Sequence, residues 1–111
     1  MNELEMNVAA AKMLGHHPQH LGDEKSVMIP VVLNEGEYVT YTPFNIFIYP
    51  VDCLAAIECL FDRYELELRQ SNGIYYWAVR IRCGEGFIDG SADTLQQAIG
   101  AACVEVMKDD H

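Results

Sequence analysis

The amino-acid sequence predicts an α+β fold, a single layered α/β sandwich domain with a mainly antiparallel sheet and the order α-β-β-α-β-β-α. Three observations predict it. Residues 64–83 alternate apolar and polar side chains around an Asn72-Gly73 pair, which is typical of a β-hairpin. Helical periodicity marks three separate segments. Two short runs rich in Val and Tyr lie between the first two helices. At 111 residues, the chain is expected to be one domain, residues 1–111.

The first helix is predicted over residues 3–14. Leu4, Val8, Ala11 and Leu14 form an apolar stripe at helical spacing. Gly15 is placed to end the helix in the left-handed conformation. Residues 15–25 are a loop by composition.

Two strands are predicted at Val27–Leu33 and Tyr38–Thr42, joined by residues 34–37. Pro30 has no N–H, so its strand lies at an edge or is broken there. Residues 43–50 are apolar and form either a further strand or a packed connection. The first strand is apolar on both sides, so either residues 43–50 cover it or a second subunit does, as a homodimer.

A second helix is predicted from Val51 to Phe61, with Leu54, Ile57 and Phe61 toward the core. In the hairpin that follows, an Asn72-Gly73 turn pairs Ser71 with Ile74. The apolar face then contains the pairs Leu68–Trp77, Leu66–Val79 and Tyr64–Ile81. The mostly polar face contains the pairs Glu65–Arg80, Glu67–Ala78 and Arg69–Tyr76.

Residues 84–90 are predicted to turn, with Phe87 and Ile88 in a short strand. Asp93 is placed as the N-cap of the last helix, and Gln96 completes a capping box. Residues 108–111 are expected to fray. The core stripe of this helix is Leu95, Ala98, Ile99, Ala102, Cys103 and Val106.

The formal charge is −10, from 17 acidic and 7 basic residues. This balance argues against nucleic acid and against a membrane as partners, because both need clustered Lys and Arg. It fits a basic protein partner, or solubility alone. The N-terminus lacks the pattern of a secretory signal, and no stretch is long and apolar enough to span a bilayer. The expected location is the cytoplasm.

Cys53, Cys59, Cys83 and Cys103 lack metal-ligand spacing and lie among apolar residues. In a reducing compartment they are expected to act as small core hydrophobes. A disulfide or a metal role is the alternative.

Two groups of residues could carry chemistry. His16, His17 and His20 could bind Zn²⁺ or Ni²⁺, or could lie in a solvated loop. Glu85, Asp89 and Asp93 could hold a divalent ion or act as acid and base. A cap role for Asp93 and turn roles for Glu85 and Asp89 explain these carboxylates better. No nucleophile is tied to a base, so neither an enzyme nor a cofactor is predicted.

The candidate partner-binding residues are Glu65, Glu67, Arg69, Tyr76 and Arg80, on the polar hairpin face. Tyr and Arg are enriched at protein interfaces. The alternatives are stacking within the sheet or burial of this face under a third layer.

Three segments carry a resemblance to a known family: Asn7-Val-Ala-Ala-Ala-Lys-Met-Leu-Gly15, Tyr49-Pro-Val-Asp-Cys-Leu-Ala-Ala-Ile57 and Ser91-Ala-Asp-Thr-Leu-Gln-Gln-Ala-Ile99. With the Trp-bearing hairpin, they resemble the phage ABA sandwich domain family over most of the chain except roughly residues 20–45. His16 and Ile57 stand where that family has Trp. The resemblance implies a three-layer fold and a phage or prophage origin, and no activity.

Residues 75–106 also resemble part of the HicB-like antitoxins, through Asp93-Thr94-Leu95 and Ala98. The DNA-binding module that follows in that family is absent from this sequence.

The expected function is therefore that of a small acidic phage or prophage accessory protein that binds a host or phage protein stoichiometrically, for instance as an anti-defence inhibitor. The alternatives are an antitoxin-like neutraliser of a small basic toxin, a small-ligand or metal binder, and a structural oligomer in the virion.

Overall fold

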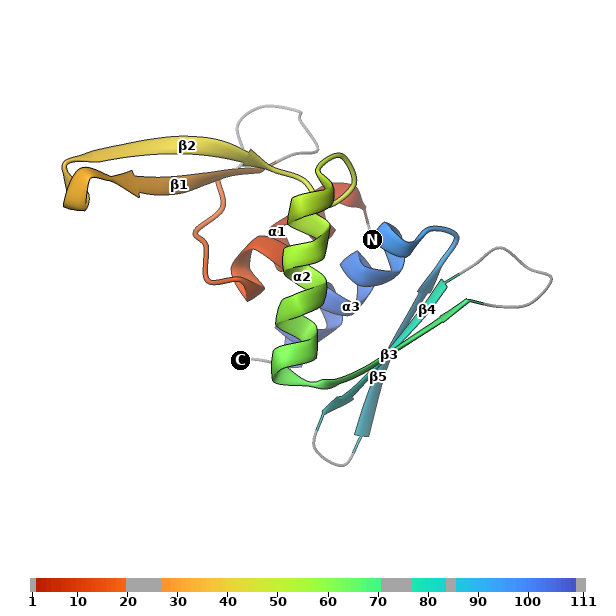
Figure 1. Cartoon of the computed structure of the whole chain (residues 1–111). Helices are drawn as coiled ribbons and strands as arrows, with labels where there is room; N and C mark the ends of the chain where they lie inside the picture. The colour runs from red at the N-terminus through yellow and green to blue at the C-terminus, as the bar shows by residue number, and fades with distance from the viewer. Residues whose placement is uncertain (1, 20–26, 71–76, 84–85, 110–111) are drawn as a thin grey trace.

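Three helices lie between a projecting two-stranded sheet and a three-stranded sheet (Figure 1). The computed structural model describes residues 2–19, 27–70, 77–83 and 86–109. The order of elements predicted from the sequence is confirmed, and the short strand expected at Phe87 and Ile88 extends over seven residues as β5. The elements are α1 (Glu3–Met13), β1 (Val27–Leu33), η1 (Asn34–Gly36), β2 (Tyr38–Phe44), α2 (Pro50–Arg63), β3 (Glu65–Gln70), β4 (Trp77–Cys83), β5 (Gly86–Ala92) and α3 (Leu95–Asp109).

Helix α1 begins where Asn2 Oδ1 accepts the N–H of Glu5 at 2.8 Å, and it ends before Gly15, whose φ is +88°. The predicted stripe is correct at Ala11, which is fully buried. Leu4, Val8 and Leu14 are half-buried and pack against the edge of the core. The other residues that α1 buries are Met6, Asn7, Ala9, Ala10 and Met13. Small residues dominate this buried face because α1 packs closely along α3.

Close approach of α1 and α3 occurs at Gly100. A Cβ atom at this position would lie 2.7 Å from both Cβ and Sδ of Met6. Glycine is therefore the residue that lets the two helix backbones come this near. Beside the crossing, Leu4 and Val8 of α1 and Val104 and Met107 of α3 line an apolar groove.

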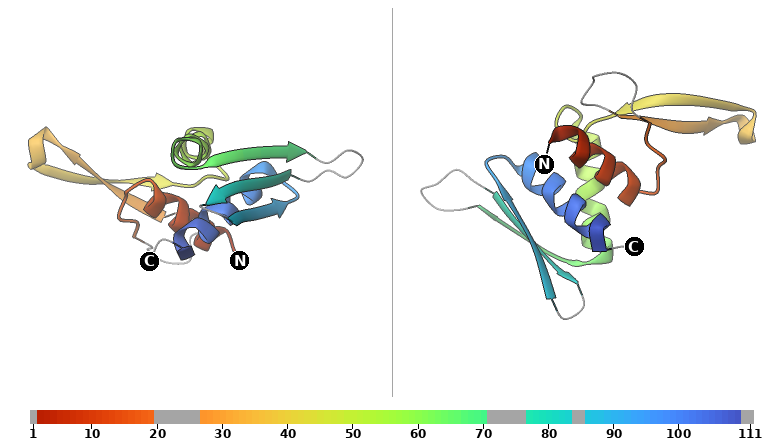
Figure 2. Two further views of the ribbon diagram at one scale, coloured as in Figure 1. Left: turned by 90° about the horizontal axis from the view of Figure 1, so that it is seen from below. Right: turned by 180° about the vertical axis from the view of Figure 1, so that it is seen from behind.

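Strands β1 and β2 form an arm, residues 27–44, that extends away from the helices (Figures 1 and 2). Both strands were predicted correctly, and β2 continues two residues further than expected. The turn between them has positive φ at Asn34, Glu35 and Gly36. The base of the arm is anchored in the core by Val27, Ile29 and Phe44, which are buried. All the remaining residues of β2, from Tyr38 to Pro43, are exposed.

Residues 45–49 form a packed connection, so the further strand considered for residues 43–50 is limited to the end of β2. Ile46 N donates to Asn7 Oδ1 at 2.8 Å, and Asn7 is fully buried. Asn45 Oδ1 accepts the N–H of Phe47 at 2.8 Å, while Asn45 N donates to Asp52 Oδ2 at 3.0 Å. These bonds satisfy buried backbone groups and hold the connection against both α1 and α2.

Helix α2 presents a different face to the core from the one predicted. The buried residues are Cys53, Ala56 and Leu60. Leu54 and Phe61, which were predicted to be core residues, are 54% and 55% exposed, and Ile57 is half-buried. The helix is apolar on two sides, and its small residues are the ones that fit against α3 and α1.

Strands β3, β4 and β5 form an antiparallel sheet in that order. The apolar face of the predicted hairpin is correct, because Val79 and Ile81 are fully buried and Leu66 and Leu68 pack against the core. The predicted register is wrong by two residues. The observed pairs are Glu65–Arg82, Leu66–Ile81, Glu67–Arg80, Leu68–Val79, Arg69–Ala78 and Gln70–Trp77. A slip of two keeps every side chain on its face, and the proposed Asn72-Gly73 turn lies outside the described residues.

Helix α3 packs across β4 and β5 and carries the predicted core stripe. Ala98, Ile99, Ala102, Cys103 and Val106 are buried, and Leu95 is half-buried. The predicted cap was one residue early: Thr94 Oγ1, not Asp93, accepts a helix N–H, from Gln97 at 3.2 Å. The helix continues through Lys108 and Asp109, where the sequence predicted fraying.

Candidate functional site

The outer face of β3 and β4 carries four of the five residues predicted to bind a partner. Glu65, Glu67, Arg69 and Arg80 are exposed there, on the side of the sheet away from the helices. Among the described residues, no third layer covers them. Tyr76 lies outside the described residues. These four residues and Arg82, which is also exposed, are called the charged sheet face below.

Arginine and glutamate side chains on this face form ion pairs, one within a strand and one between neighbouring strands. Arg69 Nε forms an ion pair with Glu67 Oε1 on the same strand, and Arg82 Nη1 lies 3.4 Å from Glu65 Oε2 on the neighbouring strand. The predicted Glu65–Arg80 pair is wrong, because Glu65 stands opposite Arg82 and Glu67 opposite Arg80. All four paired side chains are about half-exposed or more, so each pair contributes little to stability.

The charged sheet face carries three arginines and two glutamates, and the register places Asp89 of β5 opposite Arg80. Arg82 was missed from the sequence, because the register chosen there placed it beyond the paired strands. The spacing Arg80-x-Arg82 was the available signal, since alternate residues of a strand share a face.

Two recesses join on this face. A shallow pocket of about 220 Å³ is lined by Leu66 together with Glu65, Glu67, Arg80 and Arg82. Glu65 and Arg82 also line a pocket of about 580 Å³ that continues to the end of α2 at Arg63 and Tyr64. Guanidinium groups beside an open recess can bind carboxylates or phosphates through paired hydrogen bonds.

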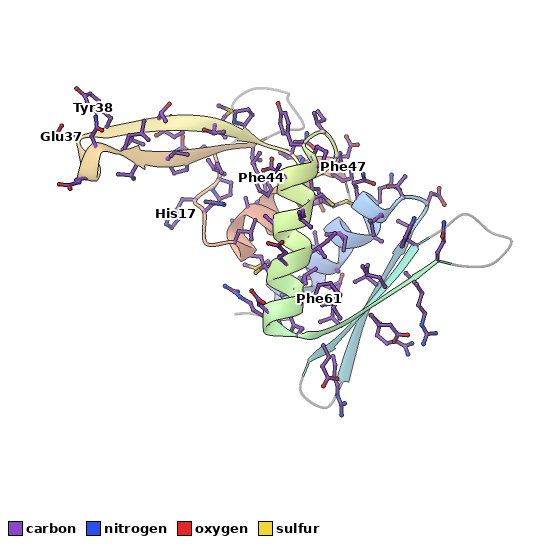
Figure 3. The ribbon with its side chains drawn as sticks, viewed as in Figure 1. His17, Glu37, Tyr38, Phe44, Phe47 and Phe61 are labelled. Carbon is purple, nitrogen blue, oxygen red and sulfur yellow. The ribbon has the colours of Figure 1, made fainter. Side chains whose placement is uncertain are left out.

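The histidine cluster predicted as a weak metal site is not brought together by the described residues. His16 is half-buried, and its ring centroid lies 6.2 Å from that of Phe44, tilted by 56°. His17 is exposed, and Figure 3 shows it beside the segment that leads from α1 to the arm. His20 lies outside the described residues. The contact with Phe44 gives His16 a packing role at the base of the arm.

Of the three carboxylates predicted as a possible site, the structure describes only the side chain of Asp93. Asp93 is exposed before α3, while Glu85 and the side chain of Asp89 lie outside the described residues. Within the described part of the chain, no three His, Cys, Asp or Glu side chains are placed to hold a metal ion.

The cysteines whose side chains are described are free thiols that pack in or beside the core, as expected for small hydrophobes. Cys53 and Cys103 are buried, and Cys59 is half-buried. Burial raises the pKa of Cys53. The pKa of Cys103 is raised to about 12, chiefly by burial and further by the charges that Cys59 and Cys53 would carry as thiolates. Such a thiol is protonated, and therefore unreactive, at neutral pH.

The raised pKa of Cys103 predicts a loss of stability at alkaline pH. In the unfolded chain the thiol loses its proton near its ordinary pKa of 9.0, whereas the folded protein keeps the proton up to about pH 12. Over that window this residue alone lowers the free energy of unfolding by about 1.4 kcal/mol per pH unit. Urea unfolding of wild type and Cys103→Ala at several pH values above 9 checks this, and equal slopes would contradict it.

A second surface was predicted only in part, through the strand Val27–Leu33 that residues 43–50 or a second subunit would cover. Large apolar side chains are exposed along the arm, on the connection after it and on α2. They are Val32, Leu33, Tyr38, Val39, Tyr41, Ile48, Tyr49, Val51, Leu54 and Phe61. Leu33 and Tyr38 lie on one face of the arm, and Val32, Val39 and Tyr41 lie on the other. These last three, together with the exposed apolar residues of the connection and of α2, are called the exposed apolar patch below.

Among the described residues, none of the helices has both the length and the apolar character needed to cross a bilayer. Comparison of the chain with protein-family models, with curated proteins and with solved structures finds no match.

Proposed function

We propose that this chain is a binding protein without catalytic activity, and that it acts by forming a stoichiometric complex with another protein through the charged sheet face. The observation that carries this proposal is that helices cover one face of the β3–β5 sheet, while the described charged residues on the other face are exposed. A sheet face of this kind is a rigid platform for side chains that contact a partner.

Two properties of the face support protein binding. Arg is among the residues enriched at interface hot spots, and three arginines gather here. Their present ion pairs, Arg69 with Glu67 and Arg82 with Glu65, are exposed and weak. A partner can therefore replace them with its own charges at small cost, and the recess beside Leu66 offers room for an inserted side chain.

The resemblance to the phage ABA sandwich domain family supports a phage or prophage origin, with the protein acting in the cytoplasm of the host cell. In that setting the function proposed is that of an accessory protein that binds a host protein and interferes with it, as an anti-defence inhibitor does.

Neutralisation of a small basic toxin is the second candidate. The net charge of −10 favours it, because most of the carboxylates lie outside the charged sheet face and complement a basic partner. The resemblance to HicB-like antitoxins agrees with it. A short basic reading frame next to the gene would favour this candidate over the first.

The proposal predicts that reversing charge on the sheet face abolishes partner binding. In the double variant Arg69→Glu/Arg80→Glu, affinity for the partner is expected to fall at least about 30-fold, because both replaced side chains lie at the centre of the proposed interface. Tagged protein is incubated with lysate of a plausible host, co-eluting protein is identified by mass spectrometry, and the affinity is then measured with the purified partner.

The matched control is Lys12→Glu/Lys108→Glu. It makes the same change in charge at exposed positions on α1 and α3, and Lys108 is likewise ion-paired, with Glu105 at 3.2 Å. A partner that binds wild type and control equally at a one-to-one ratio, and the sheet variant weakly, supports the proposal. Equal loss in both variants would indicate a general charge effect and argue against this face.

A further inference from the structure

We infer that the exposed apolar patch is an interface between two copies of this chain, in which the arm of each copy lies along the exposed face of α2 of the other. This surface is separate from the charged sheet face, so the inference stands independently of the function proposed above.

The arm lacks a partner along most of its length. Its outer face is apolar throughout and consists of Met28, Pro30, Val32, Val39, Tyr41 and Pro43. An isolated two-stranded ribbon is at best marginally stable in water and needs a further strand or a helix against it. Beyond the anchored base, no described part of the same chain provides one, and Figure 1 shows the arm directed away from the three helices.

Helix α2 likewise has large apolar side chains that no described part of the chain covers. Val51, Leu54 and Phe61 are 76%, 54% and 55% exposed, and their spacing puts them on one side of the helix. Ile48 and Tyr49 extend this side toward the base of the arm. Exposed apolar side chains thus follow one another along the chain from the arm, through residues 45–49, to Phe61 near the end of α2, where Figure 3 labels it.

The two surfaces match in length. A strand of seven residues spans about 23 Å, and a helix of 14 residues spans about 21 Å. Because the arm and α2 are adjacent in one chain, a two-fold axis near residues 45–49 would form both arm–helix contacts at once. That is the self-complementary arrangement of a closed dimer, in which each residue pair occurs twice.

Charge and area also favour a second copy. Strands β1 and β2 contain no charged residue, and the charges of the arm are Glu35 and Glu37 at its tip. The uncharged strands therefore bring no like charge to Glu58, the exposed carboxylate on the same side of α2 as Leu54 and Phe61. Without Leu33 and Tyr38, which lie on the other face of the arm, the exposed side chains of the patch present on the order of 800 Å² at about 100 Å² of exposed surface each. One partner of a stable complex contributes about 800 Å².

The test uses complementary charges at the two halves of the proposed contact. Light scattering after size exclusion at micromolar concentration is expected to give wild type a mass of twice 12.5 kDa. Val39→Lys on the arm and Leu54→Glu on α2 are each expected to weaken the dimer at least about 30-fold, since each puts an unpaired charge into a buried contact. Mixing the two variants is expected to restore association, because one of the two contacts in the mixed dimer is unchanged and both substitutions fall in the other contact.

The controls are Thr40→Lys, an exposed residue of β2 on the opposite face of the arm, and Arg69→Glu on the charged sheet face. Arg69→Glu is expected to leave the dimer intact. Circular dichroism establishes that each variant is folded. A monomeric wild type overturns the inference. So does a dimer that is insensitive to Leu54→Glu, which would indicate contact between arms alone, or one insensitive to Val39→Lys, which would indicate contact between helices alone.

Discussion

Replacing Leu60 by Ala is expected to lower the free energy of unfolding by about 2–5 kcal/mol. Leu60 is fully buried where α2 packs against the other helices. Truncation removes its apolar surface from the core and leaves a cavity that backbone elements on several sides cannot collapse to fill. Urea unfolding followed by the fluorescence of Trp77, the single tryptophan of the chain, measures the change.

The neighbouring Phe61→Ala is the matched control, because the sequence alone favoured Phe61 as the core residue. At 55% exposure it is expected to change the stability of the monomer by less than about 1 kcal/mol, although it removes the larger side chain. Measurement at a concentration below that of dimer formation separates this effect from any loss of association. If Phe61→Ala were the more damaging substitution, α2 would be rotated from the orientation described.

Gly100→Val is expected to destabilise the protein by about 3 kcal/mol. A Cβ atom at this position would lie 2.7 Å from Cβ of Met6. Because Cβ is fixed to the backbone of α1, a rotamer change of Met6 cannot relieve that overlap, and the two helices must move apart. Thermal unfolding monitored by circular dichroism reports the loss as a lower midpoint.

Ala101→Val is the control for this effect. It introduces the same side chain at the next position of α3, which is only half-buried, so it carries mainly the helix-propensity cost of Val. Intrinsic propensity alone would make Gly100→Val stabilising, since Gly is the poorer helix former. The sign of the change therefore decides whether helix contact or propensity governs this site.

Local signals were sufficient for most of the elements. The strand Val27–Leu33 was predicted residue for residue, because its apolar run is bounded by the turn residues after Leu33. Gly15 was correctly placed at the end of α1, since only glycine readily adopts the positive φ found there. The core stripe of α3 was confirmed because that helix has one apolar side and a polar one.

The orientation of α2 was not predictable in the same way. Leu54, Ile57 and Phe61 lie on one side, and Cys53, Ala56 and Leu60 lie on the other. Periodicity weighted by hydrophobicity selects the side with three large residues. Tertiary packing selected the side where Leu60 stands beside two small residues, because small side chains permit close contact with the neighbouring helices.

The hairpin register failed for a related reason. Asn72-Gly73 is the strongest short turn signal, yet the described pairs leave six residues between Gln70 and Trp77. Hydrophobic alternation cannot detect a slip of two, since it leaves each face unchanged. The register error changed only which residues of the candidate site stand opposite each other. The residues expected to share one face do so, and Arg82 joins them; the expected ones are Glu65, Glu67, Arg69 and Arg80.

The packing of α1 has a consequence for how the protein is made. Helix α1 is synthesised well before α3, with which it has its main contact, and its buried Asn7 awaits the N–H of Ile46, 39 residues later. Contacts so distant along the chain form only after long loops have closed. The N-terminal half therefore has no complete core while it is being synthesised, and the core is expected to close only once α3 has left the ribosome.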